Sequence, residues 1–137
     1  MPMRMRMLMR MLMQTRLLLR SQLILVALLS VFTTAVRADV ADVISAQATQ
    51  SRDGTWRVDA TIAHADTGWD HYANGFEVLT PDGTLLATRV LHHPHVNAQP
   101  FTRSVSVTIP AGIKQVIVRA QDSVHGQGGA QLTIDLN

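Results

Sequence analysis

The 137-residue chain contains no cysteine, and this absence removes several kinds of chemistry. A disulfide framework, a thiolate metal site and a lipid-modified anchor cysteine are all excluded within these residues. A type-1 blue-copper centre is excluded as well, because it requires a cysteine thiolate. A folded domain of this composition must rely on its hydrophobic core, which is sufficient at about 100 residues.

Acidic residues are absent from the first 38 positions, which carry six arginines. The remainder has six basic and ten acidic residues, so its net charge is −4 when the histidines are neutral. A basic protein would suggest a nucleic-acid partner. Because the basic excess lies in the first segment alone, we exclude nucleic acid as a partner of the rest of the chain.

The first 38 residues are arranged like a secretory signal peptide. Arginines precede an apolar run at 23–29, and Val36 and Ala38 are the small residues of a signal-peptidase site. The uncharged stretch after Arg20 has 16 residues, fewer than the roughly 20 that a membrane-spanning helix needs. We therefore predict cleavage after Ala38, a periplasmic or secreted domain of residues 39–137, and no stable membrane insertion after cleavage. A retained anchor is the alternative.

Methionine is confined to the first 13 residues, where all seven occur. This distribution favours an over-extended start, with translation beginning at Met13 instead of Met1. The predicted mature domain therefore has no thioether ligand, and soft Cu(I) coordination is not expected there.

After residue 38, apolar and polar residues alternate, with turn signals roughly every 8 to 12 residues. In the clearest strand, residues 101–109, Phe101 and Val107 share one face with Val105 and Ile109. Further strands are expected at 44–49, 56–62, around 76–78, 85–91, 116–120 and 132–136. Seven short antiparallel strands predict an all-β, immunoglobulin-like or fibronectin-III-like sandwich, with a small barrel as the alternative.

Six histidines are the unusual feature of this domain. They fall in three alternate connections, as His64 and His71, then His92, His93 and His95, then His125. Alternate connections of an up-and-down sheet lie at the same end, so all six are expected at one pole. Strand phase also predicts that His64, His92 and Asp122 point into the top of the core.

Several imidazoles and a carboxylate at one place suit a divalent metal, Zn or Cu(II). The predicted ligands are His64, His92, His93, His95, His125 and Asp122, the last either binding the metal or orienting a ligand. Asp66 and Asp70 are spare carboxylates nearby. Because imidazole binds metal only when neutral, we expect the affinity to fall below about pH 6.5.

A structural interpretation of the same residues stays open. Residues 92–99 could be an ordered loop, and His64, His92 and Asp122 could form a buried hydrogen-bond network that closes the sandwich. The domain would then be a metal-free interaction or accessory module that binds another envelope protein through its loops or an edge strand. The sequence has no nucleophile elbow and no phosphate-cradling glycine loop, so it favours a binding module over an enzyme.

Three segments carry a resemblance to known proteins: residues 68–73 (GWDHYA), 93–104 (HPHVNAQPFTRS) and 122–126 (DSVHG). Through them the chain is similar to a family of small exported bacterial proteins of uncharacterised function, over nearly the whole predicted mature domain. The resemblance implies export and one compact sandwich domain, and it implies no activity. The family pattern has Glu where this chain has Ala98 and His where it has Gln121, so two potential ligands are missing here.

Overall fold

The computed structural model describes residues 3, 5, 9–14 and 39–137. The chain divides into two compact units, Met1–Val36 and Arg37–Asn137. Residues 9–14 are helical. Most of the predicted signal peptide, with its cleavage position after Ala38, lies outside the described residues. Within the described part, no helix is long and apolar enough to cross a bilayer.

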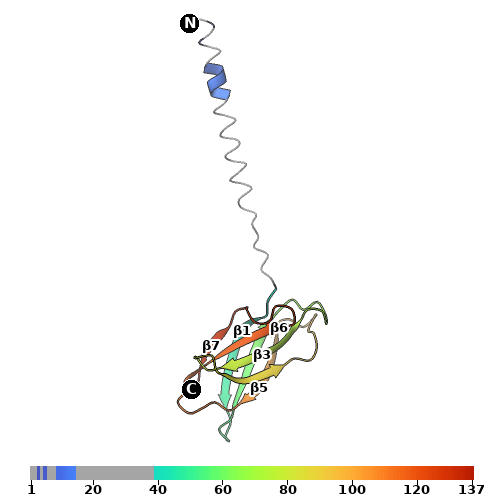
Figure 1. The fold of residues 1–137 in the computed structure, drawn as a ribbon, viewed down its shortest axis with the longest axis vertical. Helices are drawn as coiled ribbons and strands as arrows, with labels where there is room; N and C mark the ends of the chain where they lie inside the picture. The colour runs from blue at the N-terminus through green and yellow to red at the C-terminus, as the bar shows by residue number, and fades with distance from the viewer. Residues whose placement is uncertain (1–2, 4, 6–8, 15–38) are drawn as a thin grey trace. The chain divides into compact units, whose positions relative to one another are not determined.

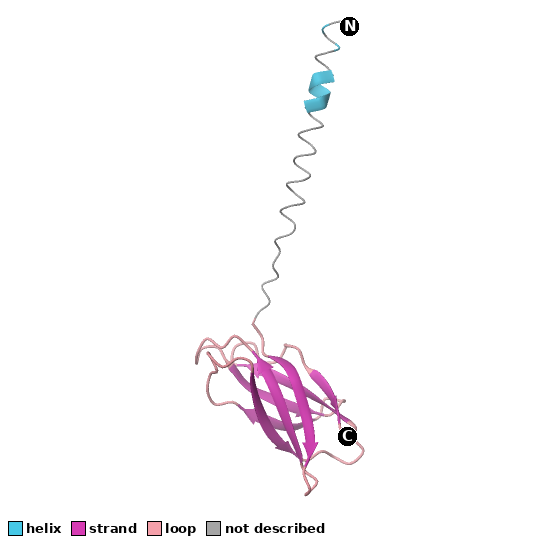
Figure 2. Cartoon of the chain, turned by 180° about the vertical axis from the view of Figure 1, so that it is seen from behind, coloured by secondary structure: helices cyan, strands magenta, loops and turns pink. Residues whose placement is uncertain are grey.

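Residues 39–137 form two facing antiparallel sheets (Figure 1, Figure 2). Their strands are β1 (Asp42–Gln50), β2 (Trp56–Ala63), β3 (Ala73–Leu79), β4 (Leu85–Val90), β5 (Phe101–Val107), β6 (Gln115–Asp122) and β7 (Leu132–Asp135). One sheet has the order β1-β2-β5 and the other the order β4-β3-β6-β7. The prediction of an antiparallel β-sandwich is confirmed, and each predicted strand overlaps an observed one.

The core lies between the two sheets and is built by alternation. In β2, Val58, Ala60 and Ile62 are completely buried, whereas the residues between them are partly exposed. In the facing sheet, Phe76 and Val78 of β3 are also completely buried. Burying a large apolar side chain stabilises the fold by roughly 1.5–3 kcal/mol. This set of strands therefore forms a core without any covalent cross-link.

The fourth strand departs from the predicted phase. The sequence places Leu86, Val90 and His92 on its inner face, but Val90 is 52% exposed and His92 is exposed, whereas Leu91 is 4% exposed. β4 is an edge strand that ends at Val90, and beyond it the Leu91 N–H donates to the Asn74 carbonyl. The predicted alternation already fails within β4, since Val90, its last residue, is exposed. The prediction that His92 points into the core is therefore wrong.

Three connections meet at one end of the sandwich, as predicted. The register pairs Ile62 with Phe101, and Ala73 with Asp122, so the end of β2 lies beside the start of β5, and the start of β3 beside the end of β6. The end of β4 likewise lies beside the start of β3. The histidine-bearing connections leave the sheets at this shared end.

The residues before β1 reach the same end. The Asp42 carboxylate accepts the Ala130 N–H at 2.6 Å. A Cβ on Gly129 would lie 2.1 Å from the Ala41 carbonyl oxygen, so only glycine allows this close approach of the two backbones. These contacts hold Ala41 and Asp42 beside the connection between β6 and β7.

Candidate metal centre

His64 lies at the base of the candidate site, with a completely buried side chain. It follows β2 and continues its inward phase, as predicted. Its Nδ1 lies 2.6 Å from Asp66 Oδ1. An ionised carboxylate only accepts hydrogen bonds, so Nδ1 carries the proton. The lone pair of Nε2 is then available on the other side of the ring.

Asp66 is a completely buried carboxylate that accepts hydrogen bonds from three donors. In addition to the His64 ring N–H, Asp66 Oδ1 accepts the Ala73 N–H at 3.0 Å, and Asp66 Oδ2 accepts the His95 N–H at 2.7 Å. Asp66 thus joins two of the histidine-bearing connections and fixes the orientation of His64. Carboxylates bonded in this way to the far nitrogen of an imidazole orient histidine ligands in metal sites.

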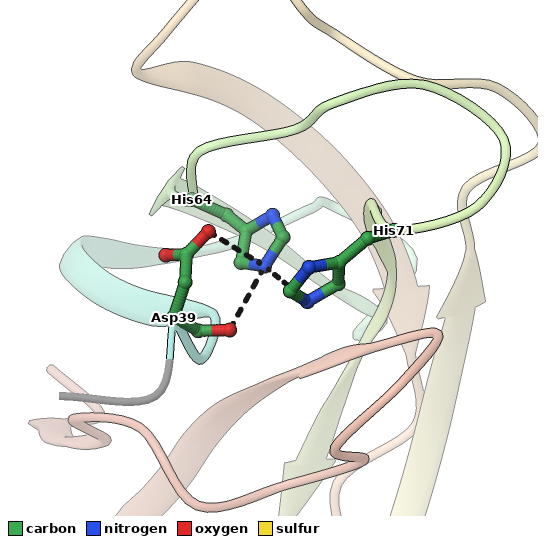
Figure 3. Close-up of side chains that lie close together, drawn as sticks. All are labelled: Asp39, His64 and His71. Atoms are coloured by element: carbon green, nitrogen blue, oxygen red, sulfur yellow. Dashed lines mark hydrogen bonds and ion pairs between the residues drawn. The ribbon is translucent and has the colours of Figure 1, made fainter. Parts of the chain in front are cut away.

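Four further residues with potential ligand atoms lie near His64 Nε2 or are linked to it through His71. His71 Nε2 lies 3.2 Å from it, and the carbonyl and carboxylate oxygens of Asp39 lie at 3.3 and 3.5 Å (Figure 3). His71 Nε2 is also 3.1 Å from Asp122 Oδ1, which is 3.2 Å from His125 Nδ1. Ligand atoms around a tetrahedral zinc lie about 3.3 Å apart when the bonds are roughly 2.0–2.1 Å. The distances between neighbouring atoms in this series are therefore close to those between coordinated atoms.

Neutral imidazoles beside ionised carboxylates supply too few protons for these contacts. With the His64 proton on Nδ1, its Nε2 faces one imidazole nitrogen and two oxygens of Asp39. A proton on His71 Nε2 can be donated to His64 or to Asp122, but not fully to both. At least one pair of acceptors is left face to face unless an additional proton or a metal cation lies between them.

Asp122 supplies negative charge next to His71. It is 3% exposed, and its Oδ1 accepts the backbone N–H groups of Val124 and His125. Burial alone would raise the pKa of this carboxyl, but the two N–H groups and the neighbouring imidazoles of His125 and His64 hold the pKa below its ordinary value. Oδ2 is buried and has no hydrogen-bond partner among the described residues. An ionised carboxylate with an unpaired buried oxygen is well suited to a cation.

We call this group of five residues the histidine centre; it consists of Asp39, His64, His71, Asp122 and His125. It contains two triads, Asp39 with His64 and His71, and His71 with Asp122 and His125, each with its ligand atoms within 4.8 Å of one another. Both triads use His71, so they share one imidazole and lie next to each other. The side chains of His71 and His125 are 20% and 34% exposed. A cation can therefore enter from their side, above the buried His64 and Asp122.

The other predicted ligands lie apart from the histidine centre. His92 and His93 are exposed, and His95 stacks on Phe101 with ring centroids 4.0 Å apart. Arg103 donates to His95 Nε2 at 2.8 Å. Neither triad includes His92, His93 or His95. The structure thus brings together His64, His125 and Asp122 from the predicted ligand set and assigns His95 to packing.

Sequence reasoning missed two members of the centre and the role of a third residue. His71 was placed at the correct end of the sandwich but not among the ligands, and a short bridge between Gly68 and His71 turns it back toward His64. Asp39 precedes the first strand, so no periodicity locates it. Asp66 was counted as a spare carboxylate, although its spacing of two residues from His64 was the available signal.

We expect His95→Ala to destabilise the domain and to leave the histidine centre unchanged. The substitution removes the stacked ring and the acceptor of Arg103, a loss of about 2 kcal/mol in the free energy of unfolding measured in urea. His93→Ala, which changes an exposed neighbour, is the matched control. A loss of metal affinity in His95→Ala as large as that of a true ligand would contradict this assignment.

The same residue should make stability depend on pH. Burial, followed by the positive charge of Arg103 and the neighbouring His93, lowers the pKa of His95. The folded state therefore favours the neutral ring. This contribution to stability is complete above the unfolded pKa of about 6.5 and is lost as the pH falls through the lower folded value. The free energy of unfolding measured in urea should therefore fall less between pH 7.5 and pH 5 in His95→Ala than in the wild type.

A protein of Halomicrobium mukohataei named "Putative lipoprotein" is 43% identical to the chain over 75 residues. This match covers 55% of the chain and 37% of that protein, so the chain spans little more than a third of its relative's length. No protein-family model matches the chain. No solved structure matches it significantly.

Proposed function

We propose that residues 39–137 form an exported module of the cell envelope that binds one divalent metal ion, Zn or Cu(II), at the histidine centre. The observation that carries this proposal is the approach of His64 Nε2 to His71 Nε2 at 3.2 Å while Asp66 holds the other nitrogen of His64. Two imidazole nitrogens at this distance share either a proton or a metal ion. Asp122 on one side and Asp39 on the other favour the divalent ion, because they add negative charge to the same place.

The donor set selects among metals. It consists of imidazoles and carboxylates, without thiolate or thioether, which suits Zn or Cu(II) and disfavours Cu(I). His64 would be the ligand fixed from behind by Asp66, whereas His71 and His125 would close on the ion from the solvent side. A bound ion would supply the positive charge that the three carboxylates Asp39, Asp66 and Asp122 lack, since none of them pairs with Lys or Arg in the described part of the chain.

The proposed fold type is the immunoglobulin-like or fibronectin-III-like sandwich. Its support is the strand order, in which β1, β2 and β5 face a sheet that contains β3, β6 and β7. In a constant-type immunoglobulin domain the fourth strand joins the first sheet, whereas β4 here pairs with β3. The connections that carry the histidines correspond to the loop end that variable immunoglobulin domains use for binding.

Export is proposed from two independent features. The first 38 residues have the charge and hydrophobicity pattern of a signal peptide, with cleavage after Ala38. The similar protein from Halomicrobium mukohataei is named as a lipoprotein. Because these 137 residues contain no cysteine, the similarity would concern the folded domain and not a lipid attachment site.

Calorimetric titration of residues 39–137 with Zn and with Cu(II) tests metal binding. The buried core lies within these residues, so the domain can be produced alone. We expect one ion per chain with a Kd of about 1 µM or tighter, and weaker binding at pH 5.5 than at pH 7.5 because protons compete for the imidazoles. A synthetic peptide of residues 88–100, which carries three of the six histidines, is the control for adventitious binding. Affinity no tighter than that of the peptide would contradict the proposal.

A second candidate is a metal-free module that binds another envelope protein through the same end. Three exposed apolar side chains favour it: Trp69, Val96 and Val124 are 69%, 50% and 58% exposed, one in each histidine-bearing connection. This candidate predicts that Trp69→Ala loses a partner from envelope extract while a metal chelator has no effect on its capture. Loss of capture with the chelator would favour the metal-dependent module.

A further inference from the structure

We propose that cleavage before Asp39 completes the histidine centre, because the newly formed α-amino group of Asp39 becomes a ligand of the same metal ion. The inference rests on the proposed metal binding and on the proposed cleavage after Ala38. It adds a ligand that the uncleaved chain does not possess. The juxtaposition that supports it is the presence of the first residue of the predicted mature domain in a triad with His64 and His71.

Asp39 presents two different oxygens to one imidazole nitrogen. Its carbonyl oxygen lies 3.3 Å and its carboxylate oxygen 3.5 Å from His64 Nε2 (Figure 3). Because His64 Nδ1 carries the proton shared with Asp66, the neutral ring offers these oxygens a lone pair and no hydrogen. A cation placed among them would turn three mutually repelling acceptors into ligands.

Cleavage changes the donor properties of Asp39. A water molecule adds across the amide bond between residues 38 and 39, so that Ala38 leaves with a new carboxylate and Asp39 keeps a free amine. The amide nitrogen has no lone pair available for a metal, whereas the amine has one once its proton passes to solvent. The amine nitrogen and the carbonyl oxygen of one residue can hold a metal in a five-membered ring. The cleaved Asp39 would thus offer a chelating pair to the ion bound by His64 and His71.

The position of Asp39 is determined by the fold and is also accessible. Asp42, three residues further on, is bonded to Ala130, and Gly129 packs against the Ala41 carbonyl, so the beginning of the domain is held in place. The Asp39 side chain is 41% exposed. A surface cleft runs beside it, lined by Val40, His64, Val96, Gln99 and Pro100. A new amino terminus would therefore have space beside His64 without disrupting the core.

Two forms of the domain test this inference. One begins at Asp39, released from a removable tag that leaves no extra residue, and the other begins at Arg37 and is otherwise identical. The amino group of the longer form is two residues away, up to roughly 7 Å along the chain. We expect the Asp39 form to bind Cu(II) at least about tenfold more tightly in competition with a chromophoric chelator, because the amine is held near the ion. Its Cu(II) electron paramagnetic resonance spectrum should show one additional nitrogen ligand.

The outcomes separate this inference from the proposed function. Equal affinities and identical spectra, with tight binding in both forms that depends on His71, would overturn the role of the amino group and leave the metal centre in place. Binding no tighter than that of the 88–100 peptide in either form would overturn both. Without metal, the two forms should unfold at the same temperature. A more stable metal-free Asp39 form with unchanged Cu(II) affinity would indicate an ion pair of the amine with the carboxylates and would also overturn the inference.

Discussion

Replacing His71 with alanine should weaken metal binding by at least about 100-fold. His71 is the residue that the two triads share, and its Nε2 lies 3.2 Å from His64 Nε2 and 3.1 Å from Asp122 Oδ1. Its removal separates the buried His64 from the Asp122 side of the centre, so each half retains only two of the five residues. Loss of a residue that only orients a ligand costs about 10–100-fold, and loss of a shared ligand should exceed this. The measurement is the Kd for Zn and Cu(II) by calorimetry or chelator competition.

The matched control for this experiment is His93→Ala. His93 is exposed and belongs to neither triad, so the substitution removes an imidazole from the same end of the domain without touching the centre. We expect its affinity to equal that of the wild type. The His71 side chain is 20% exposed and contacts the rings of His64 and His125, so its replacement should also lower the free energy of unfolding, by about 1–2 kcal/mol. If His93→Ala lost affinity and His71→Ala did not, the ligands would lie in the connection between β4 and β5.

Asp66→Asn should lower the free energy of unfolding by about 3–4 kcal/mol. The carboxylate accepts the His64 ring N–H and the backbone N–H groups of Ala73 and His95. Asparagine keeps the shape but has only one oxygen, so its amide group must face at least one of these buried donors. Urea unfolding followed by fluorescence of the buried Trp56 measures the effect. Metal affinity should also fall by about 10–100-fold, because His64 loses the partner that orients it.

Asp70→Asn is the matched control, since it makes the same chemical change four residues away. Asp70 is exposed, so its replacement should change the free energy of unfolding by less than about 0.5 kcal/mol. Affinity of the Asp66 variant is measured in the absence of urea, where near-ultraviolet circular dichroism confirms that it is folded. Equal urea midpoints for the two variants would show that the buried carboxylate does not join the two connections.

Alternation of apolar residues was enough to predict the strands, the sandwich and the end at which the histidines gather. Side-chain direction in a strand follows from a period of two, and a turn reverses the chain whatever the rest of the molecule does. These local effects also predicted correctly that His64 and Asp122 are buried, because His64 is in phase with β2 and Asp122 is the last residue of β6. The same reasoning failed for His92, because the predicted phase is already lost at Val90 in the edge strand β4 and His92 lies beyond the end of that strand.

Only the tertiary structure decided which histidines meet. His71 and Asp122 are 51 residues apart in the chain, and Asp66 accepts from a backbone group 29 residues away. Within the connections no regular dihedral pattern directs the side chains, so their directions depend on hydrogen bonds and packing against distant residues. Contacts of this kind turn His71 toward His64 and place the His95 ring on Phe101. The local sequence pattern therefore predicted which residues gather at this end of the sandwich. Long-range contacts determine which of them form the histidine centre.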